Sequence, residues 1–298
     1  MNYSIENDFL KVTVDTHGAE LVSVLNKETG DEMLWDANPA VWNRHAPILF
    51  PYCGKLKNGV YTLDGETYKG GQHGFARDFE HECISAENGK MHLVLSSNED
   101  TRRLLPRDFK FETIYTLEGR RLRHTVKVTN TGDKELRFGL GYHPGFVLPF
   151  DKQHTTEDYE LRFDTPQTPV VSETCQQGEY CGLCNETSYV MMENSRVIPL
   201  HDRLFDNDSI AMTQMTAKTI SICEKDSDRK ITVGVEGYPN VLIWSMPGTP
   251  TMQFICVEPW VTLQDPISAD GDWNHKECAA ALARGESWQT YLDMTFDR

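Results

Sequence analysis

The stretch "LRHTVKVTNTGDKELRFGLGY", Leu122 to Tyr142, carries the clearest structural signal in the chain. Its first half alternates apolar and polar residues, with Val126 and Val128 on one side and Lys127 on the other. "NTGD" then supplies turn residues, and Leu136, Phe138, Leu140 and Tyr142 resume the alternation. A period of two is typical of a strand with one face on a core. The stretch therefore predicts two antiparallel strands joined by a turn.

The same period recurs along the chain. It is present in "FLKVTVDT" (9–16), in "KITVGVEG" (230–237) and in "WQTYLDMTF" (288–296), while "NVLIWSM" (240–246) is apolar enough to be buried on both faces. "KECAAALARG" (276–285) predicts about two turns of helix ending at Gly285. No linker or repeat divides the chain, so we predict one all-β domain over residues 1–298, a large antiparallel β-sandwich.

The bulk composition excludes several classes of function. The 298 residues carry a formal net charge of −16 and lack a run of Lys and Arg, which argues against nucleic-acid binding. No stretch approaches the ~20 apolar residues that span a bilayer. "MNYSIENDFL" at the start is unlike a secretory signal, so we predict a cytoplasmic protein that does not interact with membranes.

The eight cysteines are then expected to be mostly reduced thiols. One cluster, "CQQGEYCGLC", places Cys175, Cys181 and Cys184 close together in the sequence. A Cys-x-x-Cys pair can hold half of a zinc site or act as a redox pair. Because the second half of a zinc site is missing nearby, a loop with free thiols is the favoured interpretation, and we predict no metal.

His143 extends the strand that runs through Leu136 to Tyr142. On that strand the face opposite Tyr142 carries Gly139, Gly141 and then His143. Two glycines could leave room for a ligand close to the backbone, with His143 at the rim and Pro144 ending the strand. The alternative is a histidine that merely caps a strand end.

Glu258 lies in "MQFICVEPW", an otherwise apolar strand. A carboxylate there is costly unless it has partners or unless its raised pKa is useful. Pro259 is expected to end the strand ladder, which fits an edge or a cleft wall, and Trp260 offers an aromatic platform for a sugar ring. The alternative is an ion pair with an arginine across the sheet.

His73 and Arg77 lie in the glycine-flanked segment "GGQHGFARD", which reads as a loop. Together with "GYHPGF" (141–146) and "EPW" (258–260), this order of motifs resembles the aldose 1-epimerases, or galactose mutarotases. The likeness is nearest to the shorter branch in which "PILFP" (47–51) precedes "HGFAR". It covers nearly the whole chain.

The resemblance implies a β-supersandwich with a sugar cleft, an isomerase and no cofactor. In that family a glutamate takes the proton of the anomeric hydroxyl, a "YHP" histidine protonates the ring oxygen, and the "HGF" histidine binds and polarises the sugar. By motif these roles fall on Glu258, His143 and His73. A histidine titrating near neutrality and a glutamate with a raised pKa suit this cofactor-free chemistry.

Other binding residues carry over less directly. Many family members have an arginine where this chain reads "CGKLKNG", so Lys55 or Lys57 would substitute as a point donor. The family's sugar-binding aspartate falls in "HDRLFDNDSI", as Asp206 or Asp208, with Asp206 favoured. In a related branch that acts on hexose 6-phosphates, arginines near "HGFAR" hold the phosphate.

Here Arg77, with Arg44 as a second arginine, fits a phosphate contact, a hydroxyl contact or a salt bridge with Asp78 or Glu80. The acidic composition favours a free aldohexose over a hexose 6-phosphate. Two other functions are considered, a carbohydrate-binding protein without activity and a β-sandwich interaction protein. The presence of both His143 and Glu258 favours an enzyme over a binder.

Overall fold

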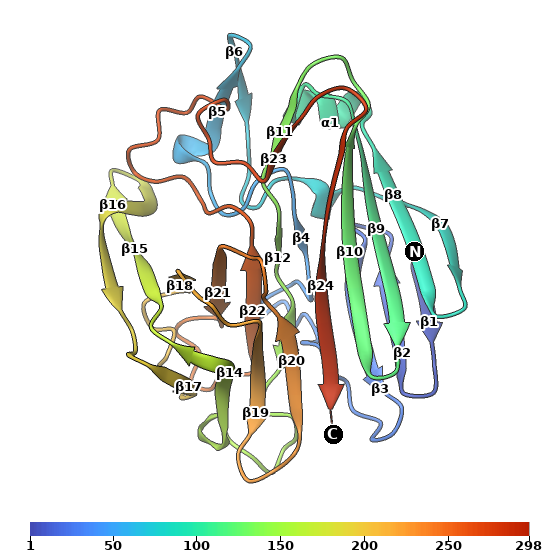
Figure 1. Ribbon diagram of the computed structural model, residues 1–298, viewed down its shortest axis with the longest axis vertical. Coiled ribbons are helices and arrows are strands. Elements are labelled where there is room, and N and C mark those ends of the chain that lie inside the picture. Colours follow the sequence, from blue (N-terminus) through green and yellow to red (C-terminus); the bar gives the residue numbers. More distant parts are fainter. Residues whose placement is uncertain (298) are drawn as a thin grey trace.

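The computed structural model describes residues 1–297, and antiparallel sheets dominate it (Figure 1). The largest sheet has nine strands, in the order β17 (Ser195–Pro199), β14 (Tyr159–Gln167), β19 (Thr219–Glu224), β20 (Lys230–Gly234), β24 (Ser287–Asp297), β10 (Arg121–Asn130), β9 (Phe109–Glu118), β8 (Lys90–Ser96) and β7 (Glu82–Glu87). The predicted all-β, antiparallel fold class is confirmed.

The second large sheet has eight strands. Its order is β16 (Tyr180–Val190), β15 (Val170–Gln177), β18 (Ile210–Thr213), β21 (Asn240–Trp244), β22 (Phe254–Trp260), β12 (Gly141–Tyr142) and β4 (Ile48–Leu49), with β13 (Gly145–Val147) also pairing with β22. Figure 1 shows β15 and β16 on the left, far from β7 to β10 on the right.

Smaller elements complete the described chain. They are the sheet β1 (Asn2–Glu6), β2 (Leu10–Asp15) and β3 (Glu20–Asn26), the pairs β5 (Val60–Leu63)–β6 (Glu66–Lys69) and β11 (Leu136–Phe138)–β23 (Ala280–Leu282), the helix α1 (Glu99–Leu104), and the 3-10 turns η1 (Lys57–Gly59), η2 (Ala76–Asp78) and η3 (Thr156–Asp158). No helix in the described part is long and apolar enough to cross a membrane.

The core forms where the alternating faces predict it. On β24 the side chains of Leu292, Met294 and Phe296 are buried, while Trp288 and Thr290 on the same face are half-buried. Strand β21 is buried on both faces from Asn240 to Ile243. Burial of such apolar faces is the main stabilising contribution to a fold of this kind.

Two local predictions are wrong. The strands flanking "NTGD" do not pair with each other: β10 pairs with β9 and β24, whereas β11 pairs with β23 and β12 with β22 and β4. The turn therefore carries the chain from one sheet to another. The amide of Asn130 holds this passage by donating to the carbonyls of Lys134 and Leu282.

The predicted helix at residues 276–285 is also absent. Its Ala280–Leu282 segment is strand β23, paired with Leu136–Phe138, and Gly285 has a φ of 79° in the turn that leads into β24. Helix propensity is a weak preference, and cross-strand pairing overrides it here.

Candidate active site

A cavity of about 590 Å³ lies against the eight-stranded sheet. Strands β15, β16, β18, β21 and β22 supply one side, and the loops around residues 42–44, 54–55 and 72–77 supply the other. Seven of the predicted site residues line it: Arg44, Lys55, His73, Arg77, His143, Glu258 and Trp260. This size is typical of small-molecule sites.

Strand register places His143 opposite Glu258. Gly141 pairs with Trp260 and Gly145 pairs with Cys256. His143 lies halfway between the two glycines, so it faces Glu258, which lies halfway between their partners. The Nε2 atom of His143 lies 3.2 Å from the Oε2 atom of Glu258. Both side chains are buried, at 7% and 1% exposure. The sequence motifs, far apart in the chain, thus meet in one wall.

The glycines before His143 do not leave an empty strip for a ligand, contrary to expectation. A Cβ on Gly139 would stand 2.2 Å from the Oγ1 atom of Thr262, and one on Gly141 would stand 2.7 Å from the indole of Trp260. Because the two glycines lack side chains, Trp260 of β22 and Thr262, two residues further on, pack closely against them.

Strand β22 is likewise not an edge that Pro259 ends. Pro259 lies inside the strand, next to Val241 of β21, and Trp260 still pairs with Gly141 on the other side. Among residues 1–297, Glu258 has no arginine as an ion-pair partner; its charged-group contact is His143. The carboxyl group therefore projects from a central strand, where the backbone is firmly held.

Burial acts on the acid and the base in opposite directions. It raises the pKa of Glu258 well above its usual value, and the charge of Asp208 adds to this while Trp260 partly offsets it. Burial lowers the pKa of His143 to about 3, with Arg77 acting in the same direction. The pair therefore favours a proton on Glu258 and a neutral imidazole, held at a distance that permits proton transfer.

Aromatic rings enclose His143, and the sequence analysis missed two of them. Trp42 stacks on the imidazole with centroids 4.9 Å apart, and Trp244 meets it edge-on at 5.6 Å. Both line the cavity. Tryptophans outside a motif carry no local signal of a site. Strand register alone would have suggested Trp244, because it stands opposite Cys256.

His73 is a buried residue with a defined tautomer. Its φ is 66°, and its backbone N–H donates to the carbonyl of Gly54. The N–H of Gly54 in turn donates to Nδ1 of His73 at 3.0 Å. Because Nδ1 accepts, a neutral ring must carry its hydrogen on Nε2. Burial lowers the pKa of His73 well below its usual value, so it stays a neutral donor.

The two arginines that line the cavity differ in how many of their hydrogen-bond donors already have partners. Arg44 donates to Glu20 and to the carbonyl of Arg77, and it pairs closely with Asp78. Arg77 donates to the carbonyl of Gln72; its Nε lies 3.9 Å from the carboxylate of Asp78, a long ion pair, and has no hydrogen bond from the described residues. Arg77 is therefore the arginine with capacity left for a ligand.

Lys57 and Asp206 do not line the cavity. The ammonium of Lys57 donates to the carbonyls of Ile267 and Ala269, and Asp206 pairs with Arg203 at the surface. Their neighbours Lys55 and Asp208 do line it. Of the two aspartates left open by the sequence, Asp208 lines the cavity, whereas the favoured Asp206 does not.

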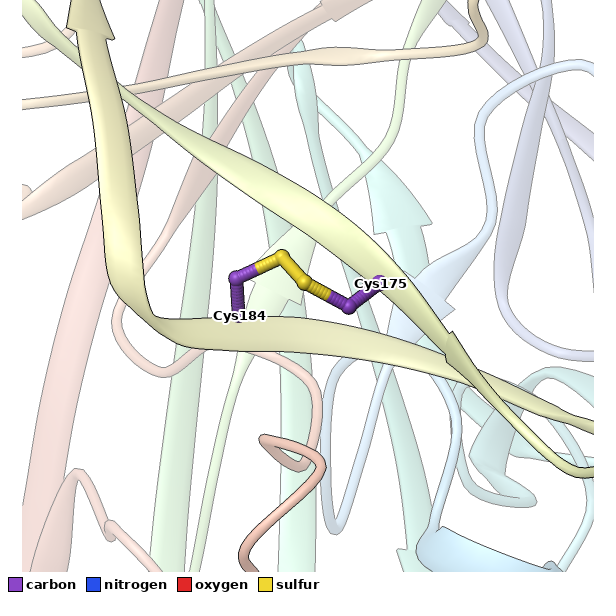
Figure 2. Close-up of a disulfide and its surroundings, with 2 residues drawn as sticks. All are labelled: Cys175 and Cys184. Carbon is purple, nitrogen blue, oxygen red and sulfur yellow. A yellow bond between two sulfur atoms is a disulfide. The ribbon is translucent and has the colours of Figure 1, made fainter.

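The cysteine cluster differs from the expected loop with free thiols. Cys175 and Cys184 form a disulfide that joins strands β15 and β16 (Figure 2). Cys181 is free and lines the cavity. The other five cysteines are free, so the expectation of mostly reduced thiols is confirmed.

A second cavity of about 560 Å³ adjoins the first and shares Ser172, Leu183, Leu263 and Gln264 with it. Its buried carboxylate, Asp265, is paired with Lys276 and accepts from the backbone of Lys57. This charge is already balanced, unlike that of Glu258. The His143–Glu258 pair lines the first cavity.

The whole chain matches a known family. The family model of aldose 1-epimerase covers residues 1–295. The chain belongs to the aldose 1-epimerase family. Its membership supports a mutarotase-type function and an isomerase-type enzyme, and the resemblance inferred from the motifs is confirmed.

Solved structures agree in fold with this family. A galactose mutarotase related enzyme from Lactobacillus acidophilus is 34% identical, with a TM-score of 0.93 over 100% of this chain and 98% of its own. A galactose mutarotase-like protein from Lactobacillus casei is 27% identical, with a TM-score of 0.89 over the full length of both chains. Protein LacX (plasmid) of Lactococcus lactis subsp. lactis is 29% identical over 90% of each chain.

Proposed function

We propose that the protein interconverts the α and β anomers of an aldohexose, with Glu258 and His143 as the acid–base pair. The 3.2 Å contact between their side chains carries this proposal. The hydroxyl oxygen O1 and the ring oxygen O5 of an aldose are both bonded to C1. A catalyst that moves protons on both oxygens therefore needs its acid and its base side by side.

The reaction begins with the pair in its ionic form, in which the shared proton lies on His143. The carboxylate of Glu258 takes the proton of O1, and the imidazolium gives a proton to O5. The C1–O5 bond breaks, its electron pair goes to O5, and C1 becomes an aldehyde. Rotation about C1–C2 presents the other face of the aldehyde. The reverse transfers close the ring and restore both side chains.

Burial of the free pair favours the neutral form over this ionic form. The sugar must therefore supply groups that stabilise the charges as it binds, and its hydroxyls can donate to the carboxylate. Nδ1 of His73 is occupied by the backbone, and its Nε2 lies 3.2 Å from the side-chain amide of Gln72, which a sugar oxygen would replace as the partner of the Nε2–H. The aromatic walls keep water away from the pair.

The substrate proposed is an unphosphorylated sugar. A phosphate group requires several converging donors. Arg44 is already neutralised by Glu20 and Asp78, which leaves Arg77 and Lys55. Asp208 adds negative charge to the same cavity. These charges suit hydroxyl groups better than a dianion.

Polarimetry on freshly dissolved α-glucose and α-galactose tests the function. Acceleration by the wild type, lost in folded Glu258→Gln and His143→Asn variants, is the expected result. Exchange spectroscopy by NMR with hexose 6-phosphates tests the specificity. Acceleration only with the phosphorylated sugars would overturn the substrate proposal. Silence with both classes, together with sugar binding, would make the protein a binder instead.

A further inference from the structure

Cys256 completes a group of three potential metal ligands at the acid–base pair. It lies two residues before Glu258 on β22, so both side chains project from the same face of the strand. One ligand atom each from Cys256, Glu258 and His143 lie within 4.8 Å of one another. All three residues are buried, and Cys256 is a free thiol with 0% exposure. The proposed reaction uses no thiol.

The spacing suits a tetrahedral ion. With zinc–nitrogen and zinc–oxygen bonds of about 2.0–2.1 Å, a tetrahedral site separates the two ligand atoms by about 3.4 Å. The observed separation between Nε2 of His143 and Oε2 of Glu258 is 3.2 Å. Oε2 also has no hydrogen bond from the described residues, so a cation would displace no other partner. His143 and Glu258 line the cavity, so a bound ion would be next to it.

We propose that Cys256, His143 and Glu258 form a binding site for Zn²⁺ and similar thiophilic divalent cations, and that the bound ion inhibits the enzyme. The ion takes the place of the proton that Glu258 and His143 share and also displaces the thiol proton of Cys256. Two protons are released for each ion bound, so the affinity increases with pH. Both catalytic atoms are then occupied, and neither can act on a sugar.

A second group of potential ligands in the described chain is less suited to binding a cation. Asp151, His154 and Glu224 also bring ligand atoms together. However, Arg229 already lies 2.6 Å from Asp151 and 3.2 Å from Glu224, and Tyr159 donates to Glu224. A cation would have to displace the guanidinium. The thiolate, moreover, makes the first group selective for softer metals.

Co²⁺ titration of the whole protein tests the binding, without reference to activity. In a buffer free of thiols and chelators, the wild type should develop the near-ultraviolet absorption of a thiolate–cobalt bond, and Zn²⁺ should abolish it. Cys256→Ser should lose this absorption and bind at least about 100-fold more weakly. Cys53→Ser is the matched control, because Cys53 is equally buried and free but belongs to neither group. Cys256→Ala serves if the serine variant does not fold.

Inhibition is measured on the same proteins, and this part rests on the proposed function. Zn²⁺ should slow mutarotation by the wild type and Cys53→Ser, reversibly on chelation, and should leave Cys256→Ser active. Equal cobalt absorption or equal inhibition in Cys256→Ser would overturn the proposal, as would absence of binding by the wild type. A cobalt signal lost in Cys256→Ser, in a protein without mutarotase activity, would support the metal site and contradict the proposed function.

Discussion

Two of the histidine–carboxylate groups in the described chain have surroundings that differ in nearly every respect. At the cavity wall, His143 and Glu258 are buried beside tryptophans, and within the described chain neither forms an ion pair with an arginine, although the charge of Arg77 acts on His143. Near the start of η3, His154 contacts Asp151 at 2.8 Å in a half-exposed cluster completed by Glu224 and Arg229. The same residue types are thus poised for proton transfer in one place and fixed as ion pairs in the other.

The pKa values of the histidine and the carboxyl groups differ between the two places accordingly. The hydrogen bond with Asp151 raises the pKa of His154, and the neighbouring acidic groups add to it. Partial burial would raise the pKa of Asp151, but hydrogen bonds from His154, Gln153 and Arg229 hold it below its usual range. At the cavity both shifts are reversed, because burial without compensation favours the uncharged forms. Environment, more than residue identity, separates the proposed catalytic pair from the ionic cluster.

The largest expected effect is on activity. Glu258→Gln should reduce the rate of mutarotation by ~10²–10⁴-fold, because it removes a group that can accept a proton. Glu224→Gln, the matched change in the ionic cluster, should leave the rate within about twofold. Polarimetry on both variants checks this. Comparable losses in the two would mean that the comparison does not identify the active site.

Thermodynamic stability should respond in the opposite order. Glu224→Gln should lower the free energy of unfolding by about 1–3 kcal/mol, because Tyr159 and Arg229 lose a charged acceptor. Glu258→Gln should leave it unchanged or raise it by about 0.5–2 kcal/mol, since an unfavourably buried acid is removed. Urea denaturation at pH 7 measures both. A strongly destabilised Glu258→Gln variant would indicate a structural role for this carboxyl group.

The pH dependence of stability should also differ in sign. The pKa of His143 is lowered on folding, so this residue costs stability as the pH falls below about 6.5 and toward 3. The pKa of His154 is raised, so its contribution is fully present below about pH 6.5 and is lost as the pH rises through its folded value. As the pH is lowered from 8 to 5, the stability of His143→Asn should increase relative to that of the wild type, and the stability of His154→Asn should decrease relative to it. Denaturation midpoints at the two pH values report this.

The smallest effect is expected from Asp208→Asn. The charge of Asp208 helps to raise the pKa of Glu258, so its removal should lower that pKa. The falling limb of the pH–rate profile, where the pair loses its one proton, should therefore move to lower pH, with a change in KM from the lost hydroxyl contact. Asp206→Asn is the control, since Asp206 pairs with Arg203 and does not line the cavity. An equal shift in both variants would count against a role for Asp208.

The sequence predicts the strands well because their apolar alternation is a local property. It places Leu292, Met294 and Phe296 on a buried face, and the structure agrees. The prediction from sequence fails where the structure of a segment depends on the strand with which it pairs. Strand β23 was expected to be helical because its pairing with β11, more than a hundred residues earlier, is invisible in its own residues. The "NTGD" turn was interpreted as a hairpin for the same reason.

The candidate site shows the same division. Motifs identify His73, His143 and Glu258, and strands β12 and β22 place the last two. Trp42 and Trp244 were missed because a stacked ring is defined by a contact in space. Lys57 could not be distinguished from Lys55, since neighbouring residues can point to different surroundings and only the fold shows which one faces the cavity.

The most direct test of the central claim is a double-mutant cycle on the pair, measured as anomer exchange of an aldohexose by NMR. Glu258→Gln, His143→Asn and the combination of both are compared with the wild type. If the two side chains act as one acid–base unit, the double variant should be little slower than the slower single variant. Independent, multiplicative losses, or a single variant that keeps most of the wild-type rate, would contradict the account.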